Sequence, residues 1–260
     1  MPHLRSFLYA LTFLVAFLPA AYAAEHTGGS LDSVLAARSE EDRARDDYRH
    51  PAETLAFFRV EPGMTVAEGL PVGGWYTRIL ANYLGKDGTL YGVNYADRMF
   101  PMFGFATPEW IEQRIASTGK FGELVGTFTD NGVTAKGFTF ESVPAEVNGT
   151  VDRVLLIRAL HNLNRFEAEA GTRSNALAAV HKMLRDDGLV GVVQHRAPAS
   201  ASDDWAVGSA GYLKQAAVIA MFEEAGFELV AESEVNANPL DKPTETDIVW
   251  RLPPSLRGSE

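Results

Sequence analysis

The sequence contains no cysteine among its 260 residues. Disulfides, thiol nucleophiles and thiolate metal sites are therefore excluded. Positive charge is also scarce: 23 Lys and Arg stand against 34 Asp and Glu, for a formal net charge of -11. Nucleic acids and anionic membrane surfaces select proteins with clustered Lys and Arg. We therefore expect a small-molecule ligand and no nucleic-acid partner, while the oligomeric state stays open.

Long apolar runs are rare as well, and the chain has one near its start. Residues 7–18 carry no charge, follow Arg5 and precede Pro19 and the small-residue stretch Ala21-Tyr22-Ala23. This is the layout of a secretory signal peptide, and the run is shorter than the roughly 20 residues of a membrane-spanning helix. We predict a signal peptide over residues 1–23, a periplasmic or secreted protein, and no membrane attachment after cleavage. An uncleaved anchor is the alternative.

The remainder alternates between strand and helix patterns. Apolar segments bounded by Gly, Asp or Asn predict seven strands, at residues 65–70, 89–94, 136–141, 151–157, 189–194, 227–233 and 247–252. Helical patterns lie between several of them, for example at residues 75–84, 168–184 and 212–225. This alternation predicts an α/β fold with a mainly parallel sheet and helices on both faces. Residues 24–50 read as a leader and an amino-terminal helix.

The first predicted strand runs into a glycine-containing turn, TVAEGLPVGGWYT over residues 65–77. An acidic residue followed by spaced glycines resembles the first motif of class I methyltransferases. More narrowly, the chain is similar to a family of exported predicted methyltransferases. Further segments match that family in chain order: Tyr48-Arg49-His50-Pro51, Arg158-Ala159-Leu160-His161-Asn162, His195-Arg196-Ala197, Glu224-Ala225-Gly226-Phe227 and Asn238-Pro239.

The resemblance implies a fold and a cofactor. The fold would be a Rossmann-like, doubly wound, mainly parallel seven-stranded sheet, forming a class I methyltransferase-like domain over residues 51–260. The cofactor would be S-adenosylmethionine. Glu68 would bind its amino group, Gly73 and Gly74 would form the tight turn beside it, Asn94 would contact the ribose, and Glu141 would lie near the adenine.

The turn departs from the motif at two positions. With Glu68 aligned to the motif's acid, Leu70 and Val72 stand where glycines are usual. Glycine allows φ > 0 and close approach of the backbone to a ligand, whereas a β-branched side chain tolerates φ > 0 poorly. We therefore expect Val72 to be the more disruptive change. Asn94 is a third departure, because an acid usually stands there and an amide binds hydroxyls without the help of a charge.

Two histidines follow predicted strands four and five. His161 and His195 would lie at the same carboxyl edge of the sheet, because these strands are neighbours in the expected topology. A histidine pair suits general-base catalysis near neutral pH. The pair could also begin a metal site, but the spacing fixes no third ligand, and we predict none.

Other polar residues share that edge. We place Arg158, Asn162, Arg196 and Tyr212 with the substrate, and Tyr48 to His50 as a segment that folds over the ligand. Two functions follow. One is an S-adenosylmethionine-dependent methyltransferase acting on an unidentified small molecule in the cell envelope. The other is a methyltransferase-fold protein that has lost methyl transfer and binds another small ligand or runs a different His-assisted reaction. A purely structural role is a third possibility.

Overall fold

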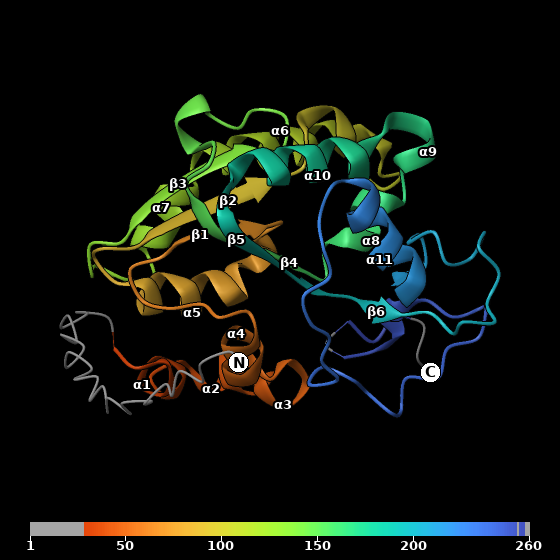
Figure 1. Cartoon of the computed structure of the whole chain (residues 1–260), viewed down its shortest axis with the longest axis horizontal. Helices are drawn as coiled ribbons and strands as arrows, with labels where there is room; N and C mark the ends of the chain where they lie inside the picture. Colours follow the sequence, from red (N-terminus) through yellow and green to blue (C-terminus); the bar gives the residue numbers. More distant parts are fainter. Residues whose placement is uncertain (1–28, 254, 258–260) are drawn as a thin grey trace, which may run out of the picture.

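The computed structural model describes residues 29–253 and 255–257. The predicted signal peptide, residues 1–23, lies outside the described residues. Figure 1 shows a central sheet with helices above and below it and the short amino-terminal helices beneath helix α5. Over the described ranges, no helix is both long and apolar enough to cross a membrane.

Five parallel strands form the central sheet: β1 (Thr65–Gly69), β2 (Thr89–Asn94), β3 (Thr134–Thr139), β4 (Val151–Ile157) and β5 (Leu184–Val193). Their spatial order is β3-β2-β1-β4-β5. The order reverses between β1 and β4, which defines a doubly wound sheet with its ligand crevice at the carboxyl ends of those strands. The predicted Rossmann-like α/β fold is therefore confirmed for these five strands.

The helices before, between and after the strands are short to medium in length. They are α1 (Leu31–Ala36), α2 (Glu40–Arg43), α3 (Asp46–Arg49), α4 (Pro51–Phe57), α5 (Trp75–Leu84), α6 (Pro108–Gly119), α7 (Phe121–Gly126), α8 (Leu160–Asn164), α9 (Glu167–Ala170), α10 (Thr172–Met183) and α11 (Gln215–Glu224). Ser30 and Ser39 accept backbone hydrogen bonds at the starts of α1 and α2, as helix-capping serines do. The charged segment 31–49, which reads as one helix in the sequence, thus forms three short helices, and the third, α3, begins without a side-chain cap.

The sheet is buried on both faces. Successive side chains of a strand point to opposite faces, so Leu155 packs with Leu80 of α5 while Leu156 packs with Val180 of α10. Helices α1 and α4 extend the layer of α5, with Leu55 fully buried. The amino-terminal helices therefore belong to the core layer on the α5 side.

The last two predicted strands do not form, and the prediction of seven strands is not confirmed. Residues 227–233 have no strand pairing, and Val249–Arg251 is a short 3₁₀ helix. The first segment and the residues just after it make side-chain contacts instead: Gln215 donates to Glu232, Glu234 pairs with Arg196 at 2.8 Å, and Asn236 Nδ2 donates to Thr54 Oγ1 at 2.9 Å. Alternating hydrophobicity predicts a strand but cannot supply a backbone partner.

A small second sheet forms after β5. Strand β6 (His195–Arg196) pairs in parallel with β7 (Tyr212–Leu213). Helix α11 therefore begins at Gln215 rather than at the predicted Tyr212. The main sheet thus ends at β5, and the chain beyond it encloses a cavity at the carboxyl ends of the strands.

Candidate functional site

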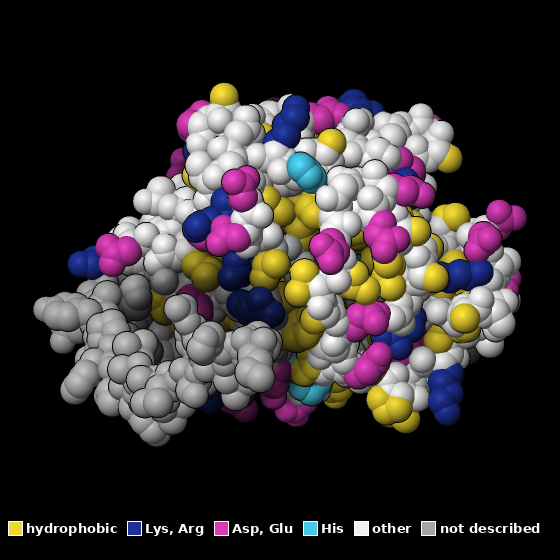
Figure 2. Space-filling view, in the orientation of Figure 1, with side chains coloured by type: hydrophobic (Ala, Val, Ile, Leu, Met, Phe, Trp, Pro, Cys, Tyr) yellow, Lys and Arg dark blue, Asp and Glu magenta, His cyan; other side chains and the backbone are white. Residues whose placement is uncertain are grey.

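A large open cavity of about 1920 Å³ lies where the strand order reverses. Its walls come from the ends of β1 and β4, from β5, from the segment around α3, and from residues 226–243. Figure 2 shows a hollow in the surface of the molecule, with hydrophobic side chains inside it and charged side chains around it. Segments singled out in the sequence analysis meet in this cavity, including those containing Arg49, Arg158, His195 and Asn238.

Glu68 stands near the end of β1 and lines the cavity. It is 7 % exposed, and its Oε2 accepts a hydrogen bond from Thr77 Oγ1 at 2.7 Å. Burial raises the pKa of this carboxyl from its ordinary 4.5 to about 7, against the opposing effect of the Thr77 hydroxyl. A cationic ligand group placed beside Glu68 would favour its ionised form.

The turn after β1 keeps a glycine-like backbone although it has lost a glycine. Leu70 has φ +57°, and Gly73 and Gly74 have φ +73° and +68°. An added Cβ at Gly73 would meet nothing within 4 Å, whereas one at Gly74 would press on the Phe128 ring at 3.1 Å. The predicted tight turn therefore forms, with Gly73 facing open space.

The expectation for Val72 is wrong in its physical reason. Val72 is not among the described residues with positive φ; the strained position is Leu70. Val72 lines the cavity and is 69 % exposed.

Arg158 follows β4 and is also held in the left-handed region, at φ +56°. Its Nη2 donates to the backbone carbonyl of Tyr48 at 3.2 Å. Arg49 approaches from α3 and lies over the Trp75 ring, 4.6 Å from guanidinium carbon to ring centroid. Burial and the nearby Arg158 lower the pKa of Arg49 to about 10. Strained residues at a cavity are typical of functional sites.

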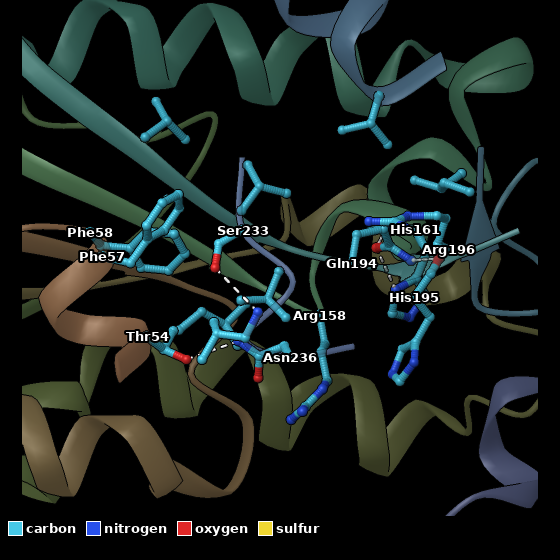
Figure 3. A pocket seen from close by; sticks show the side chains of 18 of the residues that line it. Thr54, Phe57, Phe58, Arg158, His161, Gln194, His195, Arg196, Ser233 and Asn236 are labelled. Atoms are coloured by element: carbon cyan, nitrogen blue, oxygen red, sulfur yellow. Dashed lines mark hydrogen bonds between the residues drawn. The ribbon is translucent and has the colours of Figure 1, made fainter. Parts of the chain in front are cut away.

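His161 lies on α8 and is almost completely buried, at 4 % exposure. Gln194 holds it: the amide nitrogen of Gln194 donates to the carbonyls of His195 and Gly211, which leaves Oε1 to accept from His161 Nδ1 at 3.2 Å. Figure 3 shows this contact. Nδ1 therefore carries the proton, and Nε2 is the basic nitrogen. Burial lowers the pKa of His161 to about 4.

His195 has the more accessible ring of the two histidines, with 27 % of its side chain exposed. Figure 3 shows its ring and the Arg158 side chain extending in the same direction. Its Nδ1 lies 4.0 Å from Asp241 Oδ2. Burial lowers the pKa of His195 to about 3, and Arg158, His161 and Arg251 add to this effect. Both histidines are thus neutral near pH 7, and His195 is the better placed to meet a ligand.

The predicted substrate residues divide between the cavity and the core. Arg158, Asn162 and Arg196 line the cavity, but Arg196 pairs with Glu234 at 2.8 Å. Asn162 makes a hydrogen bond with the buried Tyr95 hydroxyl. Tyr212 does not line the cavity: it is fully buried, and its hydroxyl donates to Asp241 Oδ1 at 2.9 Å. Its placement at the cavity rim is therefore wrong, because β7 turns it inward.

Of the five predicted cofactor residues, Glu68 lines the cavity, whereas Gly73 and Gly74 of the turn and the more distant Asn94 and Glu141 do not. Asn94 donates to Thr118 Oγ1 at 2.9 Å and accepts from the backbone N–H of Tyr95 at 2.9 Å. Glu141 pairs with Arg98 at 2.5 Å on the surface. Both side chains are engaged in local contacts, so the predicted ribose and adenine contacts find no support in this arrangement.

The structure adds residues to the site that the sequence patterns do not single out. Gln194 positions His161, and Asp241 approaches His195 and accepts hydrogen bonds from Tyr212 and Arg251. Gln194 carries a weak signal, since it is a polar residue at the end of an apolar strand. Asp241 carries none, because it lies in an irregular segment 46 positions after His195. Among the described residues, no group of three or more His, Asp or Glu is arranged to hold a metal ion.

Comparison with known proteins gives a likeness of fold. No family model matches the sequence, and no curated protein matches it. A SAM-dependent methyltransferase from Aquifex aeolicus is similar with a TM-score of 0.48 and 14 % identity, covering 78 % of this chain and 91 % of that chain. The [4+2]-cyclase SpnF is similar with a TM-score of 0.45 and 13 % identity, covering 70 % of this chain and 57 % of that chain.

A third similar structure is phosphoethanolamine N-methyltransferase 2 of Haemonchus contortus, in complex with phosphomonomethylethanolamine and S-adenosylhomocysteine. Its TM-score is 0.41 at 14 % identity, covering 76 % of this chain and 44 % of that chain. A reaction does not follow from likenesses of this size, because one fold carries many chemistries.

Proposed function

We propose that this protein is an S-adenosylmethionine-dependent methyltransferase acting on a small molecule. One observation carries the proposal: the cavity reaches the β1–β4 switch point, where the buried Glu68 lines it together with Leu70 and Val72 of the turn that follows β1. This is where doubly wound sheets bind nucleotide-like ligands. The signal-peptide pattern supports action in the cell envelope or outside the cell.

The residues at the end of β1 fit the methionyl part of such a cofactor. Glu68 is a buried carboxyl with a raised pKa, and a cationic amino group would compensate it. The open space at Gly73 lets a ligand approach the backbone. When bound, the cofactor supplies an electrophilic methyl group on a sulfonium centre. The adenosine part would require contacts other than those predicted for Asn94 and Glu141.

The protein's own part in the reaction is to position the reactants and to handle a proton. His195, neutral near pH 7, would accept the proton that a nucleophilic oxygen or nitrogen of the substrate releases. His161 is too deeply buried and too firmly held by Gln194 for the same task. We assign it the role of orienting Gln194, at the end of β5. Holding two reactants in one cavity accounts for most of the rate gain expected of such an enzyme.

Calorimetric titration of the protein with S-adenosylhomocysteine tests the proposal. We expect binding, and we expect Glu68→Gln to weaken it about tenfold or more, because a charge-assisted contact is lost. Glu112→Gln, on the exposed side of α6, is the matched control and should bind as the unmodified protein does. No binding at millimolar ligand would refute the proposal.

A second candidate function rests on Asn94 and Glu141, which are engaged away from the cavity. A methyltransferase fold that has lost methyl transfer would keep the cavity and its histidines while losing the ribose and adenine contacts. The same titration separates the two candidates, because the second predicts no affinity for S-adenosylhomocysteine.

A further inference from the structure

Arg49 and Arg158 line the cavity, and neither has an acidic partner among the described residues of a protein rich in acids. Over residues 29–253 and 255–257, no carboxylate oxygen lies within 4.0 Å of the guanidinium groups of Arg49 or Arg158. Both residues are half-buried and line the cavity. Charged groups removed from water are normally paired, so the absence of a protein acid points to a partner from outside.

Other sheltered arginines of this chain follow the usual rule. Arg38 pairs with Asp46, Arg173 with Glu167 at 3.4 Å and Arg251 with Asp241 at 2.8 Å. Arg153 is half-buried without an acidic partner, but it donates to the backbone carbonyls of Phe58, Arg59 and Asp152. Among the described residues, Arg49 and Arg158 have no such set of acceptors, and the neighbouring Arg45 lines the same cavity and is also unpaired.

The two guanidinium groups are close and only lightly engaged. Arg158 makes a single hydrogen bond, to the Tyr48 carbonyl, and Arg49 rests on the Trp75 ring. Each guanidinium has five N–H donors, so most of them stay available for a ligand. Burial, and after it the nearby Arg158 and Arg45, lower the pKa of Arg49 to about 10. An anion between Arg49 and Arg158 would relieve the repulsion between their charges.

The arginine pair lies near both Glu68 and His195. Burial raises the pKa of Tyr76, and Arg158, Arg49 and Glu68 also act on it, so the pair and Glu68 share this neighbour in the cavity. Arg158 also adds to the effect of burial on the pKa of His195, the better-placed base of the cavity. The groups that face His195 are Arg158 from the segment after β4, His161 from α8, Tyr212 from β7, and Asp241 and Arg251 from the carboxyl-terminal segment.

We propose that Arg49 and Arg158 bind an oxyanion group of the substrate, a carboxylate or a phosphate ester, and so present the substrate to His195. The identification of this anion as part of the substrate rests on the proposed methyltransferase function, whereas anion binding itself does not. Arginine suits both groups, because its planar fork matches their oxygens in pairs. The anion would also partly cancel the positive field of Arg158 at His195, making that ring a stronger base once the substrate is bound.

Binding of three ring compounds of similar size tests the proposal: benzoate, phenyl phosphate and uncharged benzyl alcohol. By calorimetry we expect at least one of the two anions to bind and benzyl alcohol not to bind, and the tighter anion identifies the group. Arg158→Met and Arg49→Met should each weaken the anion about tenfold or more. The control is Arg185→Met, since Arg185 lines the same cavity but is already paired with Asp152 and Asp187.

A measurement on the unmodified protein covers the case in which a variant fails to fold. The imidazole signals of His195, followed by NMR against pH, should show a higher pKa when the anion is present. Absence of anion binding, unchanged binding in both methionine variants, or an unmoved His195 titration would each overturn the proposal.

Competition with S-adenosylhomocysteine separates the substrate from the cofactor. If that compound displaces the anion, the arginines hold the cofactor's carboxylate and the proposal is wrong. Independent binding of both supports it. If S-adenosylhomocysteine does not bind at all while the anion does, the methyltransferase function fails and the anion site stands.

Discussion

The buried carboxyl of Glu68 should make the stability of this protein fall as the pH rises. Its pKa is raised from 4.5 to about 7 in the folded state. Between these values the folded state holds a proton that the unfolded state has released. The contribution of Glu68 to stability is therefore complete below about pH 4.5 and is lost as the pH rises through about 7. The shift corresponds to roughly 3 kcal/mol.

Glu68→Gln removes this titration while keeping a group of the same shape. The free energy of unfolding of the variant, relative to the unmodified protein, should rise by about 2 to 3 kcal/mol between about pH 5 and about pH 8.5. Urea unfolding at a series of pH values measures it. His161 and His195 act in the opposite direction, because their lowered pKa values give stability that is present above about pH 6.5 and lost as the pH falls through about 4 to 3. The variant and the unmodified protein both keep these histidines, so their effect cancels when one free energy of unfolding is subtracted from the other.

Glu112→Gln provides the comparison on an exposed helix face, and its profile should run parallel to that of the unmodified protein. A Glu68→Gln profile that also runs parallel would refute the reasoning, because it would mean that folding does not raise the pKa of the Glu68 carboxyl.

The remaining predictions concern backbone strain and a buried hydrogen bond. Leu70→Gly should change the free energy of unfolding by less than about 1 kcal/mol, because relief of the left-handed backbone offsets the loss of the side chain. The control is Leu189→Gly in β5, at a position that is also half-buried, and it should cost at least about 1.5 kcal/mol. Equal losses in the two variants would contradict backbone strain at Leu70. Gln194→Leu should cost about 1 to 3 kcal/mol in urea unfolding, because His161 Nδ1–H loses its acceptor. A cost too small to measure would show that the buried His161 donor does not depend on Gln194.

The part of the fold that was predictable is the part determined by local patterns. Apolar segments ending at Gly, Asp or Asn mark the five strands, because the inner strands are largely buried and each strand needs a turn at each end. The segment 227–233 has a similar pattern, yet it pairs with no strand among the described residues, and the side chains in it and just after it bind Gln215, Arg196 and Thr54. Such contacts join positions far apart in the chain, and periodicity carries no information about them.

The site likewise has residues whose position follows from local sequence patterns and residues whose position depends on contacts between distant parts of the chain. His161 and His195 meet because β4 and β5 are neighbours, a consequence of topology that the alternation of elements indicates. The position of Arg49 over Trp75 depends on how α3 docks, and no local pattern specifies docking. Asn94 stands at the predicted strand end, but its amide is taken up by Thr118 and the next backbone N–H. The cofactor and substrate roles themselves remain predictions for the experiments above.

Strand β5 pairs with β4 along one side, and over the described residues no strand pairs with its other side. An exposed strand edge is a template on which a second chain can add a strand, and so it favours self-association. The first half of β5 carries Arg185, Asp186 and Asp187, whose charges oppose such pairing. Residues 228–236 stand across the cavity from β5. The same irregular segment that encloses the ligand space thus also screens this edge, and loosening it would be expected to cost the protein solubility before it cost the fold.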